Sequence, residues 1–307
     1  MPIYPLICQP QYFQRVWGGQ RLQASDPPVG EMWAVYEGNL ISNGHWQGCS
    51  LAQVHQALGR QLTGKRAAER FPLLIKFLDC QDWLSVQVHP NDEQARQLAG
   101  ADQQGKTEVW HILAADAQAT IIAGVKPNVS AEQLAHAIRS GTILQVVQNQ
   151  SVQVGDTFFI AAGTIHALGP GLLLYELQQT SDITYRVYDW ERPAAAGRTL
   201  HIEQSVAVSD PTRQPVHTLL QDTAPAVRQI LAECDYFKLE SMPLTHPLEL
   251  DTSMDTMLIL TVVEGSAELR WQGQIWQLPR FQSVLLPAAL GKVQLCGLPT
   301  ARILLAS

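Results

Sequence analysis

The stretch VGDTFFIAAGTIHAL, residues 154–168, decides how the rest of the sequence is interpreted. Gly155 begins a turn, Thr157 to Ile160 form a short apolar strand, and a second turn leads to His166. A turn, a strand and a turn in this order direct the imidazole of His166 inward. The stretch therefore predicts a β-protein that carries a histidine in its interior.

The surrounding sequence is also rich in short β-type runs, punctuated by Gly, Pro, Asp and Asn. This pattern predicts an antiparallel sandwich or barrel. The runs are PLLIKFLDC (72–80), WLSVQVH (83–89), TEVWHIL (107–113), ATIIAGV (119–125), GLLLYELQQ (171–179) and ITYRVYDW (183–190). Two further stretches predict helices, because each starts with a serine and a glutamine three residues later that form a capping box: SLAQVHQALGRQL (50–62) and SAEQLAHAIRSG (130–141).

A second β series follows a loose, proline-containing segment at residues 209–226, so we expect a domain boundary near there. We place the two domains at residues 1–215 and 216–307. The later series is YFKLESM (236–242), MLILTVVEG (257–265), AELRWQG (267–273), IWQL (275–278), SVLLPAA (283–289) and KVQLCG (292–297).

The bulk composition excludes several classes of protein. A hydrophobic fraction of 46% over 307 residues supports a large buried core, and a net charge of -7 argues against nucleic acid as a partner. The five cysteines are widely spaced and contain no CxxC pair, which is typical of reduced core residues. We find no leader and no membrane-spanning run. We therefore expect a cytoplasmic enzyme or binding protein, a monomer or homodimer with a small-molecule ligand.

Three separate β-rich segments offer side chains that can bind a metal ion. In LSVQVHP (84–90), strand alternation places Leu84, Val86 and Val88 on one face and Ser85, Gln87 and His89 on the other. Glu108 lies in GKTEVW and His166 in the opening stretch. Two imidazoles, a carboxylate and an amide oxygen suit Zn²⁺ or another divalent transition metal. Taken alone, a histidine on a strand is more often a surface or hydrogen-bonded core side chain than a ligand, and Gln87 could simply satisfy a neighbouring backbone group.

The opening stretch resembles the second sequence motif of the cupin superfamily. Gly155, Gly163 and His166 match the glycines and the histidine of that motif, and Ala161 replaces its proline. The replacement affects the stiffness of the turn and leaves the ligand in place.

The order Gln-x-His, then Glu, then His, together with the surrounding words, closely resembles the short bacterial form of the type I mannose-6-phosphate isomerases. The matching words span most of the first 200 residues. They are RVWGG (15–19), PLLIKFLD (72–79), LSVQVHPND (84–92), GKTEVW (105–110), AGTIHAL (162–168) and LQQTSDITYRVYDWER (177–192).

The resemblance implies an all-β fold with a few helices and two jelly-roll cupin domains. The first, residues 1–215, would carry helical insertions and one Zn²⁺, held by Gln87, His89, Glu108 and His166. The second, residues 216–307, would be degenerate, because PRFQSVLLPAALG has no histidine at the ligand position.

The resemblance also assigns roles to five other residues, each of which has a simpler interpretation. It makes Arg186 catalytic and places Lys76, Lys106, Asp182 and Trp17 at the substrate. From the residues alone, Lys76 fits a strand edge as well as an anionic partner, and Lys106 fits a loop charge. Likewise, Arg186 fits a strand-surface charge paired with a nearby aspartate, and Trp17 fits core packing.

The implied activity is the interconversion of mannose 6-phosphate and fructose 6-phosphate, which moves a proton between C1 and C2 while a metal ion and nearby cations stabilise the enediolate. The general base stays unassigned; His111, on the strand face opposite Glu108, and His201 are weak candidates. Two alternatives stay open: an iron-dependent cupin dioxygenase, and a sugar-phosphate sensor that binds a metal without turnover.

Overall fold

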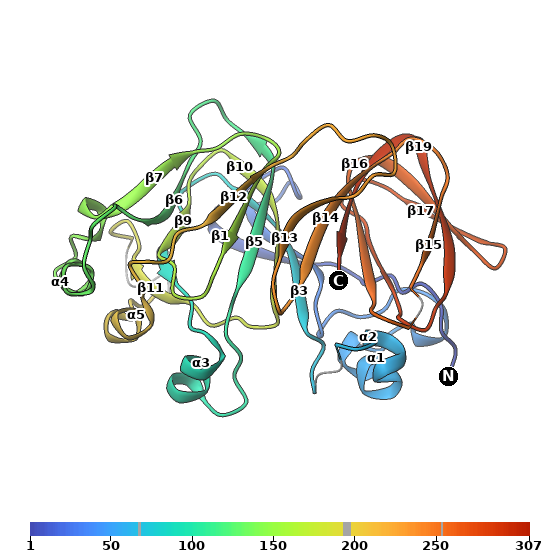
Figure 1. Cartoon of the computed structure of the whole chain (residues 1–307), viewed down its shortest axis with the longest axis horizontal. Helices are drawn as coiled ribbons and strands as arrows, with labels where there is room; N and C mark the ends of the chain where they lie inside the picture. The colour runs from blue at the N-terminus through green and yellow to red at the C-terminus, as the bar shows by residue number, and fades with distance from the viewer. Residues whose placement is uncertain (67–68, 193–197, 253) are drawn as a thin grey trace. The chain divides into compact units, whose positions relative to one another are not determined.

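The computed structural model describes residues 1–66, 69–192, 198–252 and 254–307 (Figure 1). The chain divides into two compact units. We call Tyr12–Met32 with Lys76–Thr218 the sandwich unit, and Met1–Gln11, Trp33–Ile75 and Leu219–Ser307 the terminal unit. The break at 218/219 lies close to the boundary expected at 215/216. The assignment of residues 1–215 to one domain stays a prediction.

Two antiparallel sheets shape the sandwich unit. The first has the order β1 (Gln11–Gly19), β2 (Val29–Val35), β3 (Leu73–Cys80), β10 (Leu172–Gln179), β5 (Glu108–Ala115), β8 (Asp156–Ile160) and β12 (Val216–Leu219). The second has the order β11 (Tyr185–Tyr188), β4 (Val86–Val88), β9 (His166–Leu168), β6 (Thr120–Val125) and β7 (Val147–Ser151). One apolar cluster takes side chains from both sheets, among them Trp110 and Phe158 from the first and Ile121 and Leu168 from the second.

The strand register brings the predicted ligands together. Gln87 on β4 lies directly opposite His166 on β9. Glu108 begins β5 in the other sheet, where it pairs with Gln178 of β10 and Ile160 of β8. Val86 and Val88 lie together in one apolar cluster, as the predicted alternation requires, whereas Leu84 belongs to another cluster and lines the pocket.

The motif around His166 is tied directly to the strand that carries the other histidine. Gly155 and Gly163 have φ values of 89° and 88°, which favour glycine. The backbone N–H of Gly163 donates to the carbonyl of His89 at 2.9 Å. The turn therefore keeps its shape with alanine at position 161, where the cupin motif has proline.

Both predicted helices form, with the expected capping boxes. The first is divided at Gly59 (φ 49°) into α1 (Leu51–Leu58) and α2 (Arg60–Thr63), and the second is α4 (Ala131–Arg139). Sequence periodicity missed α3 (Asp92–Ala99) and α5 (Ile202–Val208), because both are short and α3 is also polar. Two 3₁₀ turns complete the set, η1 (Gly44–Trp46) and η2 (Ile143–Gln145). Within the described residues, no helix has the length and apolar character needed to cross a membrane.

The terminal unit contains the second β series predicted from the sequence. Its sheet has the order β13 (Gln229–Glu233), β14 (Lys238–Leu244), β19 (Lys292–Ala306), β16 (Leu258–Trp271) and β17 (Gln274–Leu278). Two shorter strands pair with it, β15 (Leu248–Asp251) with β19 and β18 (Ser283–Leu286) with β16. MLILTVVEG and AELRWQG, expected as two runs, form the single strand β16, which continues past Gly265 at φ 67°.

Candidate active site

Three buried side chains converge inside the sandwich unit. The Nε2 atom of His89 lies 3.6 Å from Oε2 of Glu108, and Nε2 of His166 lies 3.4 Å from Oε1 of the same carboxylate. All three residues are at most 1% exposed. Among the described residues they form the one cluster whose ligand atoms lie close enough together to hold a metal ion.

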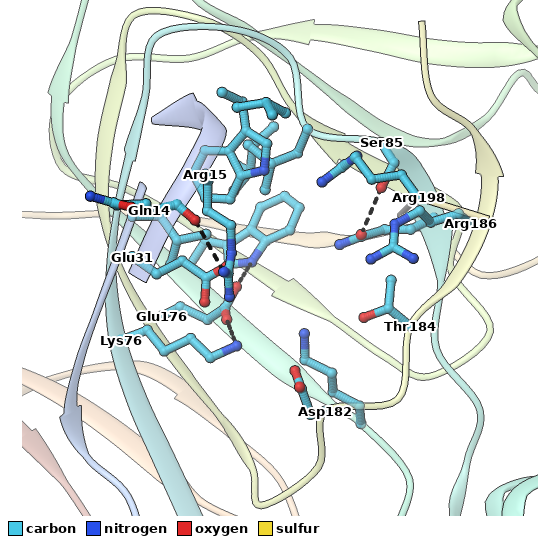
Figure 2. A pocket seen from close by; sticks show the side chains of 18 of the residues that line it. Gln14, Arg15, Glu31, Lys76, Ser85, Glu176, Asp182, Thr184, Arg186 and Arg198 are labelled. Carbon is cyan, nitrogen blue, oxygen red and sulfur yellow. Dashed lines mark hydrogen bonds and ion pairs between the residues drawn. The ribbon is translucent and has the colours of Figure 1, made fainter. Parts of the chain in front are cut away.

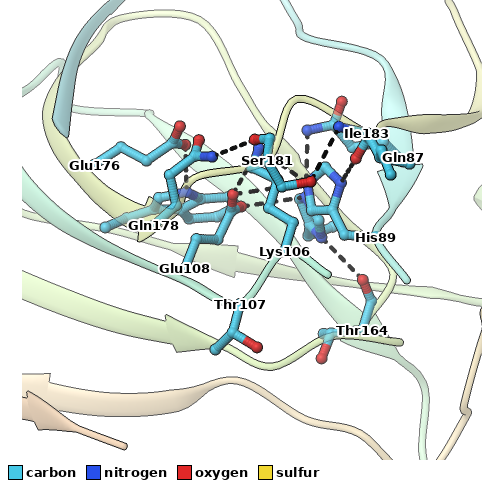
Figure 3. Close-up of polar contacts among 12 residues, drawn as sticks. Gln87, His89, Lys106, Thr107, Glu108, Thr164, Glu176, Gln178, Ser181 and Ile183 are labelled. Carbon is cyan, nitrogen blue, oxygen red and sulfur yellow. Dashed lines mark hydrogen bonds and ion pairs between the residues drawn. The ribbon is translucent and has the colours of Figure 1, made fainter. Parts of the chain in front are cut away.

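The second nitrogen of each imidazole is fixed by a backbone carbonyl. Nδ1 of His89 lies 2.8 Å from the carbonyl oxygen of Ile183, and Nδ1 of His166 lies 2.9 Å from that of Thr164 (Figure 3). Because a carbonyl can only accept, both Nδ1 atoms carry a proton and donate it. Each Nε2 therefore carries a lone pair close to Glu108, and an imidazole nitrogen with a free lone pair and a fixed partner ring nitrogen is what a metal ligand requires.

Burial also keeps both imidazoles neutral. Loss of hydration lowers the pKa of His166 to about 4, although its bond to the Thr164 carbonyl acts in the opposite direction. The pKa of His89 lies well below its ordinary value, because burial and the nearby positive charge of Lys106 disfavour a second cation. Neutral imidazole is the form that binds a metal ion.

Glu108 and Lys106 complete the electrostatics of the cluster. Oε1 of Glu108 is buried without a hydrogen-bond donor, while Oε2 lies 2.8 Å from Nζ of Lys106. The same Nζ lies 3.2 Å from Nε2 of His89. Burial acts to lower the pKa of Lys106, but the carboxylates of Glu108 and Glu176 outweigh it and raise the pKa. A carboxylate oxygen without a donor beside two imidazole lone pairs fits a divalent cation.

Gln87 can supply the amide oxygen of such a site. Its side-chain amide lies 3.2 Å from Nε2 of His166, and its other terminal atom accepts a hydrogen bond from the Ser85 hydroxyl at 3.3 Å. The O and N atoms of an amide are assigned from hydrogen bonds, so a cation at His166 would favour the flipped orientation. In that orientation the amide oxygen of Gln87 faces the histidine.

A pocket of about 580 Å³ opens beside this cluster, within the sandwich unit. Six residues predicted for the site line it: Trp17, Lys76, Gln87, Lys106, Asp182 and Arg186. His89, Glu108 and His166 lie behind Gln87 and Lys106, with almost no exposed surface. The structure thus brings together all nine residues that the sequence predicted.

The pocket wall is strongly charged, and most of its charges are paired. Arg15 pairs with Glu31 at 2.7 Å, and Lys76 pairs with Glu176 at 3.3 Å. Figure 2 shows these two pairs on one side of the pocket, and Arg186 and Arg198 on the other side with Ser85 and Thr184. The pocket therefore has one cation–carboxylate side and one side dominated by two guanidinium groups.

The two arginines are held in different ways. The guanidinium of Arg198 pairs with Asp189, whose Oδ2 and Oδ1 lie 2.5 and 3.0 Å from Nε and Nη2. In contrast, Nε of Arg186 is buried without a hydrogen-bond partner among the described residues. Burial and the charge of Arg198 lower the pKa of Arg186. The pairing of Arg186 with an aspartate, the simpler interpretation, does not occur within the described residues.

Trp17 and Asp182 occupy opposite extremes of burial. Trp17 is 3% exposed and belongs to the apolar cluster between the sheets while also lining the pocket, so it serves both of the roles considered for it. Asp182 is exposed, in the loop between β10 and β11.

Sequence reasoning missed several residues that line the pocket. Glu176 lies in the apolar run LLLYEL, as Lys76 lies in LLIKFL, so the argument made for the lysine applies equally to its partner. His201 also lines the pocket, and its Nδ1 accepts a hydrogen bond from the backbone N–H of Arg186 at 3.2 Å. Arg15, Glu31 and Arg198 have no local signal, because they reach the pocket only through tertiary packing. His111 bonds to Thr157 at 2.8 Å and is absent from the pocket lining.

Comparison with known proteins identifies the family. Residues 6–111 match the catalytic domain of type I phosphomannose isomerase, and residues 228–305 match the cupin domain of mannose-6-phosphate isomerase. The mannose-6-phosphate isomerase ManA of Bacillus subtilis is 34% identical over 97% of both chains. The chain belongs to the type I phosphomannose isomerase family. A mannose-6-phosphate isomerase of Streptococcus mutans is 41% identical over 66% of this chain and 67% of its own.

Solved structures agree with this family assignment. The mannose 6-phosphate isomerase of Bacillus subtilis superposes with a TM-score of 0.89 at 28% identity, covering 99% of each chain. A zinc-bound mannose 6-phosphate isomerase shares the fold, with a TM-score of 0.77 at 17% identity and 98% coverage of each chain. The predicted fold class, all-β with a few helices and cupin-type domains, is confirmed.

Proposed function

We propose that this protein interconverts mannose 6-phosphate and fructose 6-phosphate. The observation that carries the proposal is the pocket itself, in which a buried His-Glu-His cluster adjoins paired and unpaired cations. Family membership supplies the sugar, and the charges of the lining supply a means to bind its phosphate. The excess of cations there opposes the net charge of -7 on the whole chain.

In this proposal His89, Glu108, His166 and Gln87 hold one Zn²⁺ per chain. The fit rests on the two oriented Nε2 lone pairs and on the Oε1 atom of Glu108 that lacks a donor. When bound, the ion supplies Lewis acidity that polarises sugar oxygens. The bound zinc of the structural relative agrees with this choice of metal.

We assign the phosphate group to the side of the pocket that holds Arg186 and Arg198. Guanidinium groups suit phosphate because they present several donors in one plane. Arg186 has a donor to spare, whereas Asp189 holds Arg198 in place without removing its charge from the pocket. The hydroxyls of Ser85 and Thr184 lie on the same side (Figure 2).

The sugar carbonyl then lies toward Lys76, Lys106 and Glu176. Isomerisation removes the proton from C2 and protonates O1 to give an enediol; the proton then returns to C1 as O2 loses its own. We assign the carbon-to-carbon transfer to Glu176, because it lines the pocket and because burial and the charge of Glu108 raise its pKa, as a general base requires. Lys76, paired with it, and Lys106 stabilise the negative charge that develops on the two oxygens.

The remaining expectations concern the protein as a whole. A cytoplasmic location and a monomer or homodimer stay predictions. Asp182, at the exposed loop, and Trp17, in the wall, complete the proposed substrate contacts.

A coupled assay for fructose 6-phosphate tests the proposal. The protein is assayed with mannose 6-phosphate as purified, after chelation, and after addition of Zn²⁺; we expect activity that disappears with the metal and returns with it. Binding of mannose 6-phosphate without product at any zinc loading would establish the sensor alternative instead. Iron-dependent oxygen uptake would establish the dioxygenase.

A further inference from the structure

A group of hydrogen bonds between Gln179, Asp92, Gly105 and Thr107, which we call the node, joins three segments of the site. None of these four residues lines the pocket. The amide of Gln179, at the end of β10, donates from Nε2 to Oδ1 of Asp92 at 3.0 Å, and its Oε1 accepts from the backbone N–H of Thr107 at 2.9 Å. Oδ1 of Asp92 also accepts from the N–H of Gly105 at 2.8 Å. Asp92 follows the strand of His89, and Thr107 precedes Glu108.

The node fixes the segment that carries Lys106. Three consecutive backbone N–H groups, those of Gly105, Lys106 and Thr107, each have a set acceptor: Oδ1 of Asp92, the carbonyl of Pro90 at 3.0 Å, and Oε1 of Gln179. A reciprocal bond runs from the N–H of Gln179 to the carbonyl of Thr107 at 3.2 Å. No peptide N–H in this segment is left to water.

The segment packs closely against the backbone that follows His89. A Cβ at Gly105 would lie 2.5 Å from the carbonyl carbon of Asn91 and 2.6 Å from the backbone nitrogen of Asp92, so glycine is required for this approach. Gln179 and Thr107 are 5% and 6% exposed. Buried amide bonds of this kind are stronger than exposed ones, and breaking one leaves its partner unsatisfied.

The node adjoins the His-Glu-His cluster in sequence, because Thr107 lies between Lys106 and Glu108. Lys106 contacts Nε2 of His89 and Oε2 of Glu108, so a shift of its backbone moves the ammonium relative to both (Figure 3). The loop that follows Gln179 supplies the carbonyl of Ile183, which orients His89. One side chain thus links the segments of His89, of Lys106 with Glu108, and of Asp182.

We propose that Gln179, through Asp92, is a positioning residue that sets the spacing between the His89 and Glu108 segments and thereby the metal affinity of the site. This inference rests on the proposed function, because it takes the His-Glu-His cluster as the metal site. Gln179 does not line the pocket, and its side chain bonds to Asp92 and Thr107, so its effect is transmitted through these residues and Gly105.

The test is the variant Gln179→Glu, which keeps an acceptor for Thr107 and places a second carboxylate against Asp92. Zinc affinity is measured by competition with a chromophoric chelator, alongside turnover at saturating zinc. We expect zinc affinity to fall about 10- to 100-fold, the range for groups that orient metal ligands. Asp92→Ala breaks the same node at its other end, because it removes the Oδ1 atom that accepts from both Gln179 and Gly105, and it should weaken zinc binding in the same direction.

Gln94→Ala is the matched control, because Gln94 caps the helix that begins at Asp92 but does not touch the node. We expect it to lower the melting temperature without changing zinc affinity. Zinc affinity within twofold of wild type in folded Gln179→Glu would overturn the proposal; if that variant does not fold, the same result in Asp92→Ala overturns it. A wild-type protein that neither binds zinc nor isomerises mannose 6-phosphate would instead refute the proposed function.

Discussion

The interior of the sandwich unit and the interior of the C-terminal sheet differ in what they bury. The apolar cluster around β14, β16 and β19 is built from Met, Leu, Val, Ile and Ala side chains such as Leu260 and Leu269. The polar side chains buried in the same sheet have partners: Thr261 and Ser283 bond to each other at 2.9 Å, and Glu240 pairs with Lys238 at 3.2 Å. The sandwich unit buries an apolar cluster too, but beside it lie Lys76, Glu108 and His166.

This difference indicates which buried polar groups serve ligand binding rather than stability. Burying a charged or polar group costs free energy unless it is paired, and the buried Thr261, Ser283 and Glu240 of the C-terminal sheet are paired in this way. The Oε1 atom of Glu108 has no donor and Arg186 Nε has no partner among the described residues. Groups left in this state are expected at a site that binds a ligand.

The largest expected contrast comes from the metal ligands. We expect His166→Ala to bind no zinc and to lose about 10³-fold in kcat/KM, because Lewis acid stabilisation is worth several kcal/mol. Zinc analysis and the coupled assay measure both. His111→Gln is the control, since His111 is an equally buried histidine that bonds to Thr157 outside the cluster. Equal losses of zinc and of kcat/KM in both variants would contradict a specific role of His166 in binding the metal.

An aliphatic substitution in the other interior should have the opposite profile. Leu260→Ala removes a fully buried side chain and should lower the free energy of unfolding by about 2–5 kcal/mol. Urea titration measures this loss. Zinc content and kcat of the folded fraction should not change; if zinc is lost as well, the two interiors are not independent.

The metal-free protein should lose stability in acid through His166. Its pKa is about 4 when folded against an ordinary value of 6.5, so the unfolded chain binds more protons between these values. The free energy of unfolding therefore has its full value above pH 6.5 and falls by about 3 kcal/mol as the pH drops from 6.5 to 4. Urea titrations of chelated wild type and His166→Gln from pH 4 to 7.5 should converge as the pH falls; parallel curves would contradict the assignment.

The smallest effect concerns the turn before His166. Ala161→Pro restores the residue of the cupin motif and should raise stability by about 0.4–1 kcal/mol, because it restricts the unfolded chain. Thermal unfolding measures the gain, and zinc affinity should not change. A loss of zinc affinity would mean that the turn in this chain needs the backbone freedom of alanine.

How far the sequence predicted the structure depended on whether the signal was local. Lys76 and the LSVQVHP strand could be identified from the sequence, because each places polar residues inside an otherwise apolar run. Buried polar residues of this kind are the ones that form the site. Glu176 carried the same signal and was overlooked. Arg15 and Arg198 could not be found, because their place in the pocket depends on ion pairs with Glu31 and Asp189.

Secondary structure followed the same division. Helix α4 was predicted because its cap and apolar stripe lie within one turn of each other, whereas α3 has a cap of Asn91 and Gln94 but a single buried residue, Ala95. Strand β12 formed inside a segment expected to be loose, since pairing with β8 outweighs its weak local preference.

The most direct test of the central claim is a zinc titration of the chelated protein, with bound zinc and isomerase activity measured in the same samples. We predict one zinc per chain and turnover that rises in proportion to bound zinc, with neither in the variant Glu108→Gln. Activity toward mannose 6-phosphate that is complete before zinc binds, or zinc that binds equally well to Glu108→Gln, would contradict the account.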